Sequence, residues 1–191
     1  MPEQPVGRVG PNAILQTIAA LDSFVSAHVT DDILAHAGIR RYRDRPPRDM
    51  VGEGEVAALF RAIVERLPRD RAQAVLRRSG SGTADYILAH RIPRVAQRVI
   101  KLLPKQVALR VLLQAIGRNA WTFAGSGHVS TRLGLAPSLS IRGNAIAHPD
   151  CLWHVAVFER LFAALVSPAV TVEHPSCCSR GDRGCHFDFK C

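Results

Sequence analysis

The sequence of 191 residues lacks any continuous apolar run of the length that a membrane span requires. Its longest apolar stretches, 107–116 and 155–166, are interrupted by arginine, glutamine or glutamate. The first ten residues also lack the basic head and apolar run of an export signal. We therefore expect a cytoplasmic protein, whose cysteines stay reduced unless they bind a metal ion.

The sequence also lacks a motif for a redox cofactor. Glycine is dense only at 79–82 and 125–127, and neither stretch has the strand–GxGxxG–helix context of a dinucleotide site. We expect no nicotinamide or flavin site. A chain of this length also leaves little room for a dinucleotide domain beside a separate substrate domain.

Lysine is scarce, with 3 of the 25 basic residues, and the net charge is +9. The densest arginine run, 40–48, contains two prolines and has only Tyr42 as a nearby aromatic residue. Nucleic-acid surfaces interleave aromatic residues with basic ones or carry a reading motif. We therefore expect no nucleic-acid partner and favour a solvated arginine-rich face, for which a carboxylated small ligand is the best functional use. The sequence leaves open whether this basic loop contacts a partner enzyme or acidic membrane headgroups, and whether the chain forms a homodimer.

Apolar residues at helical spacing dominate the first two thirds of the chain. The glycine–serine stretch 79–82 is expected to end a helix, and Pro104 is expected to split another. The helices expected from this pattern cover residues 11–27, 31–38, 53–67, 70–78, 83–90 and 93–117.

From Ala120 onward, alternation of apolar and polar residues predicts strands at 120–130 and 139–146. Asp150 is expected to cap a helix that ends at Val166. Two further strands, 169–173 and 186–190, are expected on either side of a turn at 181–184. This order predicts an α+β fold in which N-terminal helices pack with a small antiparallel sheet and cover one side of it. We expect a helical extension with the basic loop at 1–50, and a ligand-binding domain with a Cys-rich hairpin at 51–191.

Four of the five cysteines lie in the last fifteen residues, and the fifth, Cys151, opens the preceding helix. A hairpin would bring Cys177 and Cys185 together near Cys151, and three converging sulfurs suit a structural zinc ion. His154, one helical turn after Cys151, is the nearest candidate for the fourth ligand. Buried inert thiols and a reactive Cys151 at a helix start are the alternatives. Rival fourth ligands are His148, His174, Cys178 and Cys191.

The C-terminal pattern resembles the 4-vinyl reductase domain family, in the form that carries an Arg-rich helical region in purple phototrophic bacteria. The matching residues are Glu173, Cys177, Gly181, Cys185 and Phe187, in a run that begins with Val172 and is preceded by Cys151 and an apolar helix. The resemblance implies a fold shared with the ligand-binding domains of nitric-oxide sensors and Golgi tethering subunits. It also implies that Cys151, Cys177 and Cys185 form the metal site, while the adjacent Cys178 leaves open which of the pair binds.

The same resemblance implies a hydrophobic pocket for a tetrapyrrole intermediate of bacteriochlorophyll synthesis. Such a pocket needs apolar walls, an axial ligand and a cation for the propionate. Trp121 and Phe123 are candidates for stacking on the ring, and His128 is the candidate for the axial ligand. Arg91, Arg94 and Arg98 form a stripe at helical spacing, from which Arg94 is the candidate for the cation, with a solvated stripe as the alternative. Packing within the core is the alternative role of the two aromatic residues.

Three functions remain open at this point. The first is a carrier or accessory protein that passes the tetrapyrrole between biosynthetic enzymes. The second is the vinyl reductase that the family name implies, acting with an external reductant because no redox-cofactor motif is present. The third is a ligand-sensing module of the same fold.

Overall fold

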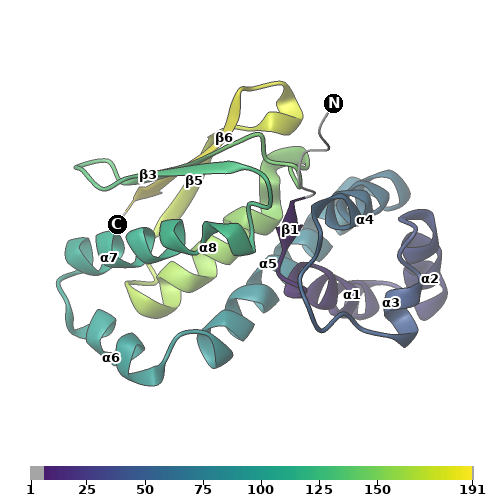
Figure 1. The fold of residues 1–191 in the computed structure, drawn as a ribbon, viewed down its shortest axis with the longest axis horizontal. Coiled ribbons are helices and arrows are strands. Elements are labelled where there is room, and N and C mark those ends of the chain that lie inside the picture. The colour runs from purple at the N-terminus through teal and green to yellow at the C-terminus, as the bar shows by residue number, and fades with distance from the viewer. Residues whose placement is uncertain (1–6, 191) are drawn as a thin grey trace.

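The computed structural model describes residues 7–190. N-terminal helices lie at one end, a four-stranded sheet lies at the other, and the long helix α5 passes between them (Figure 1). None of the helices within the described range is long and apolar enough to cross a membrane. The elements in chain order are β1 (Arg8–Val9), α1 (Asn12–Phe24), α2 (Ala27–His36), α3 (Arg41–Asp44), β2 (Val51–Gly52), α4 (Glu53–Arg66), α5 (Arg69–His90), α6 (Arg94–Leu102), α7 (Lys105–Arg118), β3 (His128–Arg132), β4 (Ser138–Arg142), α8 (Leu152–Leu165), β5 (Thr171–Ser176) and β6 (Gly184–Lys190).

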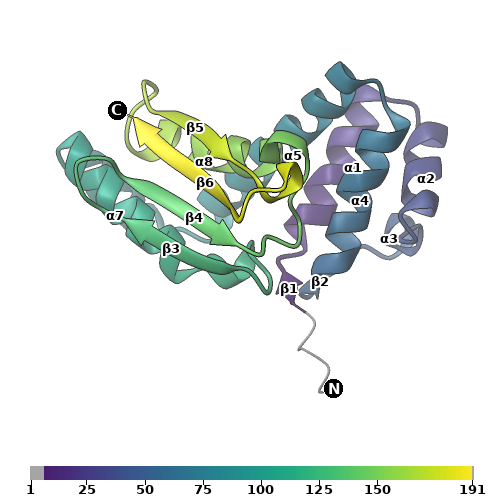
Figure 2. The same ribbon diagram turned by 90° about the horizontal axis from the view of Figure 1, so that it is seen from above.

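The large sheet is antiparallel, with the strand order β3-β4-β6-β5. Leu139, Ile141, Phe187 and Phe189 alternate with more polar residues along β4 and β6, and these four side chains are buried. Helices α7 and α8 lie against one face of the sheet, whereas the other face is turned toward the viewer in Figure 2. The predicted α+β class, with helices on one side of an antiparallel sheet, is therefore confirmed.

The N-terminal helices pack on the same core as the sheet. Ile14, Leu21 and Ile33 are fully buried together with residues of α4 and α5. Strand β1 pairs with β2 across the predicted boundary at residue 50. The division into 1–50 and 51–191 stays a prediction, and the structure joins both parts through one continuous apolar core.

The predicted helix end at 79–82 is wrong, because α5 continues through these small residues to His90. Ser79 Oγ lies 2.6 Å from Thr17 Oγ1 of α1. A Cβ atom on Gly80 would overlap the carbonyl oxygen of Trp153 and lie 2.9 Å from Ala156 Cβ, both in α8. The small residues therefore let α5 fit tightly between α1 and α8, rather than breaking the helix.

The predicted strand at 120–130 is wrong in its first half. Residues Ala120–Thr122 form a 3₁₀ turn, and β3 begins only at His128. Gly125 has φ +57°, and Glu53 accepts hydrogen bonds from the backbone N–H and hydroxyl of Ser126. This anchored turn replaces the first half of the predicted strand.

Two further boundaries also differ from expectation. The basic loop at 40–48 contains the short helix α3, in which Arg43 pairs with Asp22 and Asp31. Asp150 does not cap α8, because it has φ 61° and the helix begins at Leu152. Pro104 does split the predicted long helix, into α6 and α7.

We predict opposite effects for two alanine substitutions in α5. Gly80→Ala should lower the free energy of unfolding by about 1–3 kcal/mol, because the added methyl group overpacks the contact with α8. Gly82→Ala should instead raise it by up to about 1 kcal/mol, because alanine favours helix and the added atom meets only the movable Gln16 side chain, 2.7 Å from Oε1. Urea unfolding of both variants tests this, and equal effects would contradict the close contact.

Candidate metal centre and ligand cavity

Three cysteines and one histidine converge at the junction of α8 with the β5–β6 hairpin. One ligand atom from each of Cys151, His174, Cys177 and Cys185 lies within 4.8 Å of the others. The Sγ–Sγ distances are 3.3 Å for Cys151–Cys177, 3.5 Å for Cys151–Cys185 and 3.9 Å for Cys177–Cys185. Tetrahedral zinc with bonds of about 2.3 Å would place sulfurs about 3.8 Å apart. The group therefore has the size of a metal site, and its four residues could hold an ion.

Cys151 reaches this group through an unusual backbone. Asp150 and Cys151 both have positive φ, 61° and 43°, in the left-handed region that L-residues rarely adopt. The Cys151 N–H donates to the carbonyl oxygen of His148 at 2.8 Å, and Arg180 pairs with the Asp150 carboxylate at 3.2 Å. These contacts hold Cys151 just before α8 and direct its sulfur toward the hairpin.

A β-bulge brings His174 and Cys177 to the same side of β5. Glu173 pairs with Asp188 and Ser176 pairs with His186, so His174 and Pro175 together oppose the single residue Phe187. Residues three apart on a regular strand would face opposite sides. The extra residue in the bulge shifts the alternation by one position, so that His174 and Cys177 face the same side. The His174 ring stacks on Phe187 with 4.6 Å between the ring centres.

The three thiols share protons unequally. Hydrogen bonds with Cys151 and then Cys185 lower the pKa of Cys177, whereas the hydrogen bond with Cys177 raises the pKa of Cys151. Within the cluster, negative charge is therefore most favourable on the Cys177 sulfur. A bound cation would favour deprotonation of the other two thiols as well.

Backbone and side-chain N–H groups surround these sulfurs. The Cys178 N–H and the Asn144 amide each donate to Cys185 Sγ at 3.3 Å. The Cys177 N–H donates to the Asp182 carboxylate at 2.7 Å, which fixes the turn that carries the sulfur. Donors of this kind stabilise thiolate charge and orient ligands.

The surroundings of His174 fit a metal ligand. Both of its ring nitrogens are buried, and neither has a hydrogen-bond partner within residues 7–190. A buried polar atom normally has a partner, so its position beside three sulfurs fits a metal–nitrogen bond. Cys178, in contrast, lies outside the group, with its sulfur 4.0 Å from the Ile141 carbonyl oxygen.

The predicted fourth ligand, His154, lies elsewhere. Because Cys151 precedes α8 and has a left-handed backbone, the one-turn spacing does not bring the two side chains together. The His154 ring packs instead against Trp153 at 5.0 Å and Phe187 at 5.9 Å. The structure thus favours His174, one of the rival ligands, as the fourth member of the group. In the sequence, Pro175 is a signal for the bulge that brings His174 there, because proline within a strand is confined to edges and bulges. Cys191, another rival, lies outside the described residues.

His148, the remaining rival, supports the cluster through its backbone. Its carbonyl oxygen accepts a hydrogen bond from Ser179 Oγ at 3.0 Å and lies 3.6 Å from Cys177 Sγ. The His148 ring accepts a hydrogen bond from the backbone N–H of Trp153 at 3.2 Å, and burial lowers the pKa of the ring to about 4. The neutral ring therefore helps to fix the first turn of α8.

A second feature is an apolar cavity of about 440 Å³ between the N-terminal helices and α7–α8. This volume lies in the range of small-molecule sites. Its residues come from the start of α1, from α5, α7 and α8, and from the turn after α7. The lining includes both tryptophans of the chain, Trp121 and Trp153, together with Phe123, Phe158 and Ile116.

The cavity has a cation at its edge. Arg91 is exposed, lines the cavity and lies 6.0 Å from the centre of the Tyr86 ring, another lining residue. Trp121 also lines the cavity and is 60% exposed, so both residues mark an opening to solvent. An anionic group on an otherwise apolar ligand would be accommodated here.

Two of the four predicted ligand-contacting residues line this cavity. Trp121 and Phe123 do so from the 3₁₀ turn and the residue after it, not from a strand. Arg94 opens α6 on the surface, three residues after Arg91, and His128 is exposed at the start of β3. Sequence reasoning placed Arg91 in the same stripe as Arg94 but did not select it.

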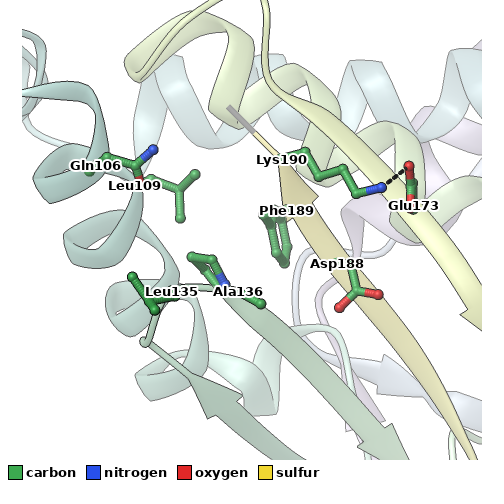
Figure 3. A pocket seen from close by; sticks show the side chains of 9 residues that line it. Gln106, Leu109, Leu135, Ala136, Glu173, Asp188, Phe189 and Lys190 are labelled. Atoms are coloured by element: carbon green, nitrogen blue, oxygen red, sulfur yellow. Dashed lines mark hydrogen bonds and ion pairs between the residues drawn. The ribbon is translucent and has the colours of Figure 1, made fainter.

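A second hollow lies at the far end of the sheet, between α7, the β3–β4 turn and β5–β6. Figure 3 shows the Glu173 and Asp188 carboxylates on one side of it, with Lys190 paired to Glu173. Its volume is similar, about 430 Å³, but its rim carries the fully exposed Leu135 and two acidic groups. Acidic groups would repel a carboxylated ligand, whereas the apolar cavity carries Arg91 at its edge.

The fold and the site define an α+β domain with an H-NOX-like fold, an apolar cavity that opens to solvent and a Cys₃His cluster. An H-NOX protein from S. oneidensis in the Fe(II)NO ligation state aligns with a TM-score of 0.55 and 12% identity, over 95% of this chain and 98% of that one. A mutant H-NOX protein from S. oneidensis in the Fe(II) state gives a TM-score of 0.52 at 13% identity, over 95% of each chain. These similarities confirm the predicted nitric-oxide-sensor-like fold.

Sequence relatives are more specific. The chain is 42% identical to the bacteriochlorophyll synthase 23 kDa chain of Cereibacter sphaeroides, over 95% of this chain and 90% of the relative. It is 40% identical to the protein of the same name from Rhodobacter capsulatus, over 97% and 88%. The chain belongs to the family of the bacteriochlorophyll synthase 23 kDa chain. No family model matches it, and membership of the 4-vinyl reductase family stays a prediction.

The environment of His154 predicts a pH-dependent loss of stability. Burial lowers its pKa from 6.5 to about 3, and the backbone of Phe123 offsets only part of this effect. Below pH 6.5 the unfolded chain therefore gains a proton that the folded chain excludes, and stability falls. Between about pH 8 and about pH 5 the wild type should lose about 2 kcal/mol more than His154→Leu. Urea unfolding at both pH values checks this, and parallel pH dependence of the two proteins would refute it.

Proposed function

We propose that this protein binds a tetrapyrrole intermediate of bacteriochlorophyll synthesis, of the Mg-porphyrin or protochlorophyllide type. In this proposal it works in the cytoplasm as a carrier or accessory protein for the biosynthetic enzymes. The relatives' name, bacteriochlorophyll synthase 23 kDa chain, supports the pathway and the association with enzymes. The apolar cavity with a single arginine at its opening is the observation that carries the ligand assignment.

The chemistry of the cavity suits a flat, apolar macrocycle with a carboxylate. Trp121, Phe123 and Trp153 offer aromatic surfaces to the ring, and burial of such surfaces supplies most of the affinity. Arg91 offers a charge-assisted hydrogen bond to the propionate. Asn12 and Asn119, which also line the cavity, offer polar groups for further orientation.

The carrier role predicts saturable binding that depends on Arg91. Titration with a Mg-porphyrin should shift the Soret band, and Arg91→Gln should raise Kd about tenfold through loss of a charge-assisted bond. Arg94→Gln is the matched control, because this arginine lies on the surface of α6. Its Kd should equal that of the wild type.

Three results would count against this proposal. If titration gave no saturable shift of the Soret band, the protein would not bind the Mg-porphyrin. If Arg94→Gln weakened binding and Arg91→Gln did not, the carboxylate would bind at α6 and not at the cavity opening. The third concerns the alternative function, vinyl reduction, which adds two electrons and two protons and so requires a reductant. Conversion of a divinyl substrate to the ethyl product by the isolated chain with nicotinamide would replace the carrier role by catalysis.

We also propose that the Cys₃His cluster binds one structural zinc ion. Three thiolates and a neutral imidazole form a common closed zinc site. The ion would join the start of α8 to the β5–β6 hairpin and offset the cost of the left-handed backbone at Cys151. Because α8 lines the cavity, the ion would stabilise the ligand site without contacting the ligand.

Paired variants test the zinc site. The purified wild type should contain about one zinc per chain, and Cys177→Ser and His174→Ala should lose the metal together with thermal stability. The neighbours Cys178→Ser and His154→Ala should keep it, because both side chains lie outside the cluster. Elemental analysis with thermal unfolding gives both readouts. Iron with acid-labile sulfide, or zinc loss in the control variants only, would contradict the assignment.

A further inference from the structure

Helix α6 presents its apolar stripe to solvent. Val95, Val99 and Leu102 follow the i, i+4, i+7 spacing of one helix face, and they are 69%, 53% and 85% exposed. Ile100 is the only buried residue of this helix. An amphipathic helix of a globular protein normally buries its apolar face, so α6 is turned outward.

The position of α6 is fixed by specific contacts. Gln97 donates from its amide to the carbonyl oxygens of Leu88 at 2.6 Å and Ile92 at 2.9 Å, across the turn between α5 and α6. Pro93 and Pro104 delimit the helix at its two ends. The outward stripe is therefore a feature of the folded chain. Val107 and Val111 on α7, 42% and 41% exposed, add apolar surface on the next helix.

Cations line one flank of the stripe. Arg94, Arg98 and Lys101 are exposed, and none of them forms an ion pair within residues 7–190. The sequence from 86 to 149 contains nine basic residues and no aspartate or glutamate. The remaining residues hold equal numbers of basic and acidic side chains, so the whole net charge of +9 lies in this segment.

We propose that the α6 face, defined as Val95, Val99 and Leu102 with Arg94, Arg98 and Lys101, docks on an anionic lipid bilayer surface. The apolar stripe would enter the headgroup region, while the flanking cations would pair with lipid phosphates. This combination favours a lipid surface over an acidic protein, because an exposed apolar stripe flanked by cations is typical of helices that lie in the headgroup region of a bilayer. The basic loop at 40–48 is less suited, since its Arg40, Arg41 and Arg43 are already paired with carboxylates.

Docking in this orientation would place the cavity near the bilayer. Arg91 and Ile92, immediately before α6, line the cavity, as do Leu112 and Ile116 of α7. Figure 1 shows α6 and α7 together at one edge of the molecule, away from α1–α4. An apolar ligand leaving the cavity past Arg91 would emerge beside the docked helix.

Vesicle flotation tests the proposal without any tetrapyrrole, so its outcome is independent of ligand binding. The wild type should bind vesicles of phosphatidylcholine with phosphatidylglycerol, and bind pure phosphatidylcholine far more weakly. The triple variant Arg94→Glu, Arg98→Glu and Lys101→Glu should lower the partition coefficient about a hundredfold. The variant Val95→Ser with Leu102→Ser, whose charge is unchanged, should lower it about tenfold.

The matched control reverses three exposed arginines in the first half of α5, Arg69→Glu, Arg71→Glu and Arg78→Glu. It has the same net charge as the α6 triple variant, and its binding should stay within about threefold of the wild type. Circular dichroism confirms that each variant is folded. Equal losses in both triple variants, or no binding of the wild type to anionic vesicles, would overturn the proposal. The second result is what an acidic protein partner predicts.

Discussion

The close crossing of α5 and α8 is the contact on which the rest of the structure depends. Gly80 lies against the Trp153 carbonyl group and Ala156, so the two helices approach more closely than a side chain at this position would allow. Both helices also line the cavity, to which α5 contributes Tyr86 and Ile87 and α8 contributes Val157. The same helix packs on the sheet, where Phe158, which also lines the cavity, meets Phe187 at 5.2 Å. One helix thus separates the cavity from the sheet and contributes to both.

The Cys₃His cluster fixes the start of that helix. It connects Cys151 to two strands of the hairpin, and one of those strands also carries Phe187 beneath α8. Movement of the hairpin would therefore shift α8 and reshape the cavity wall. The N-terminal helices close the cavity from the other side through the start of α1. In the proposed function, the cluster would support the ligand site from a distance, with α6 following Arg91 at the opening of the cavity.

Much of the fold could be predicted from the sequence, because helical spacing and alternation report directly on which face is buried. The convergence of Cys151, Cys177 and Cys185 was also predictable from a helix start and a hairpin. The errors occurred where tertiary contacts override local preference. Glycine at position 80 is a packing residue rather than a helix end, and the bulge at His174 and Pro175 changes which histidine faces the sulfurs. The cavity is formed by segments that are distant in the sequence, so spacing along one helix does not show which arginine lies at its edge. Arg94 was the predicted cation, whereas Arg91 lines the cavity.

A crystal structure of the protein with a bound Mg-porphyrin tests the central claim most directly. The account predicts electron density for the macrocycle between α5, α7 and α8, in contact with Trp121 and Phe123 and with its propionate at Arg91. The Cys₃His cluster should be separated from the ring by α8. Density for the macrocycle in the hollow beside Glu173 and Asp188, or on the outer face of the sheet, would contradict the account.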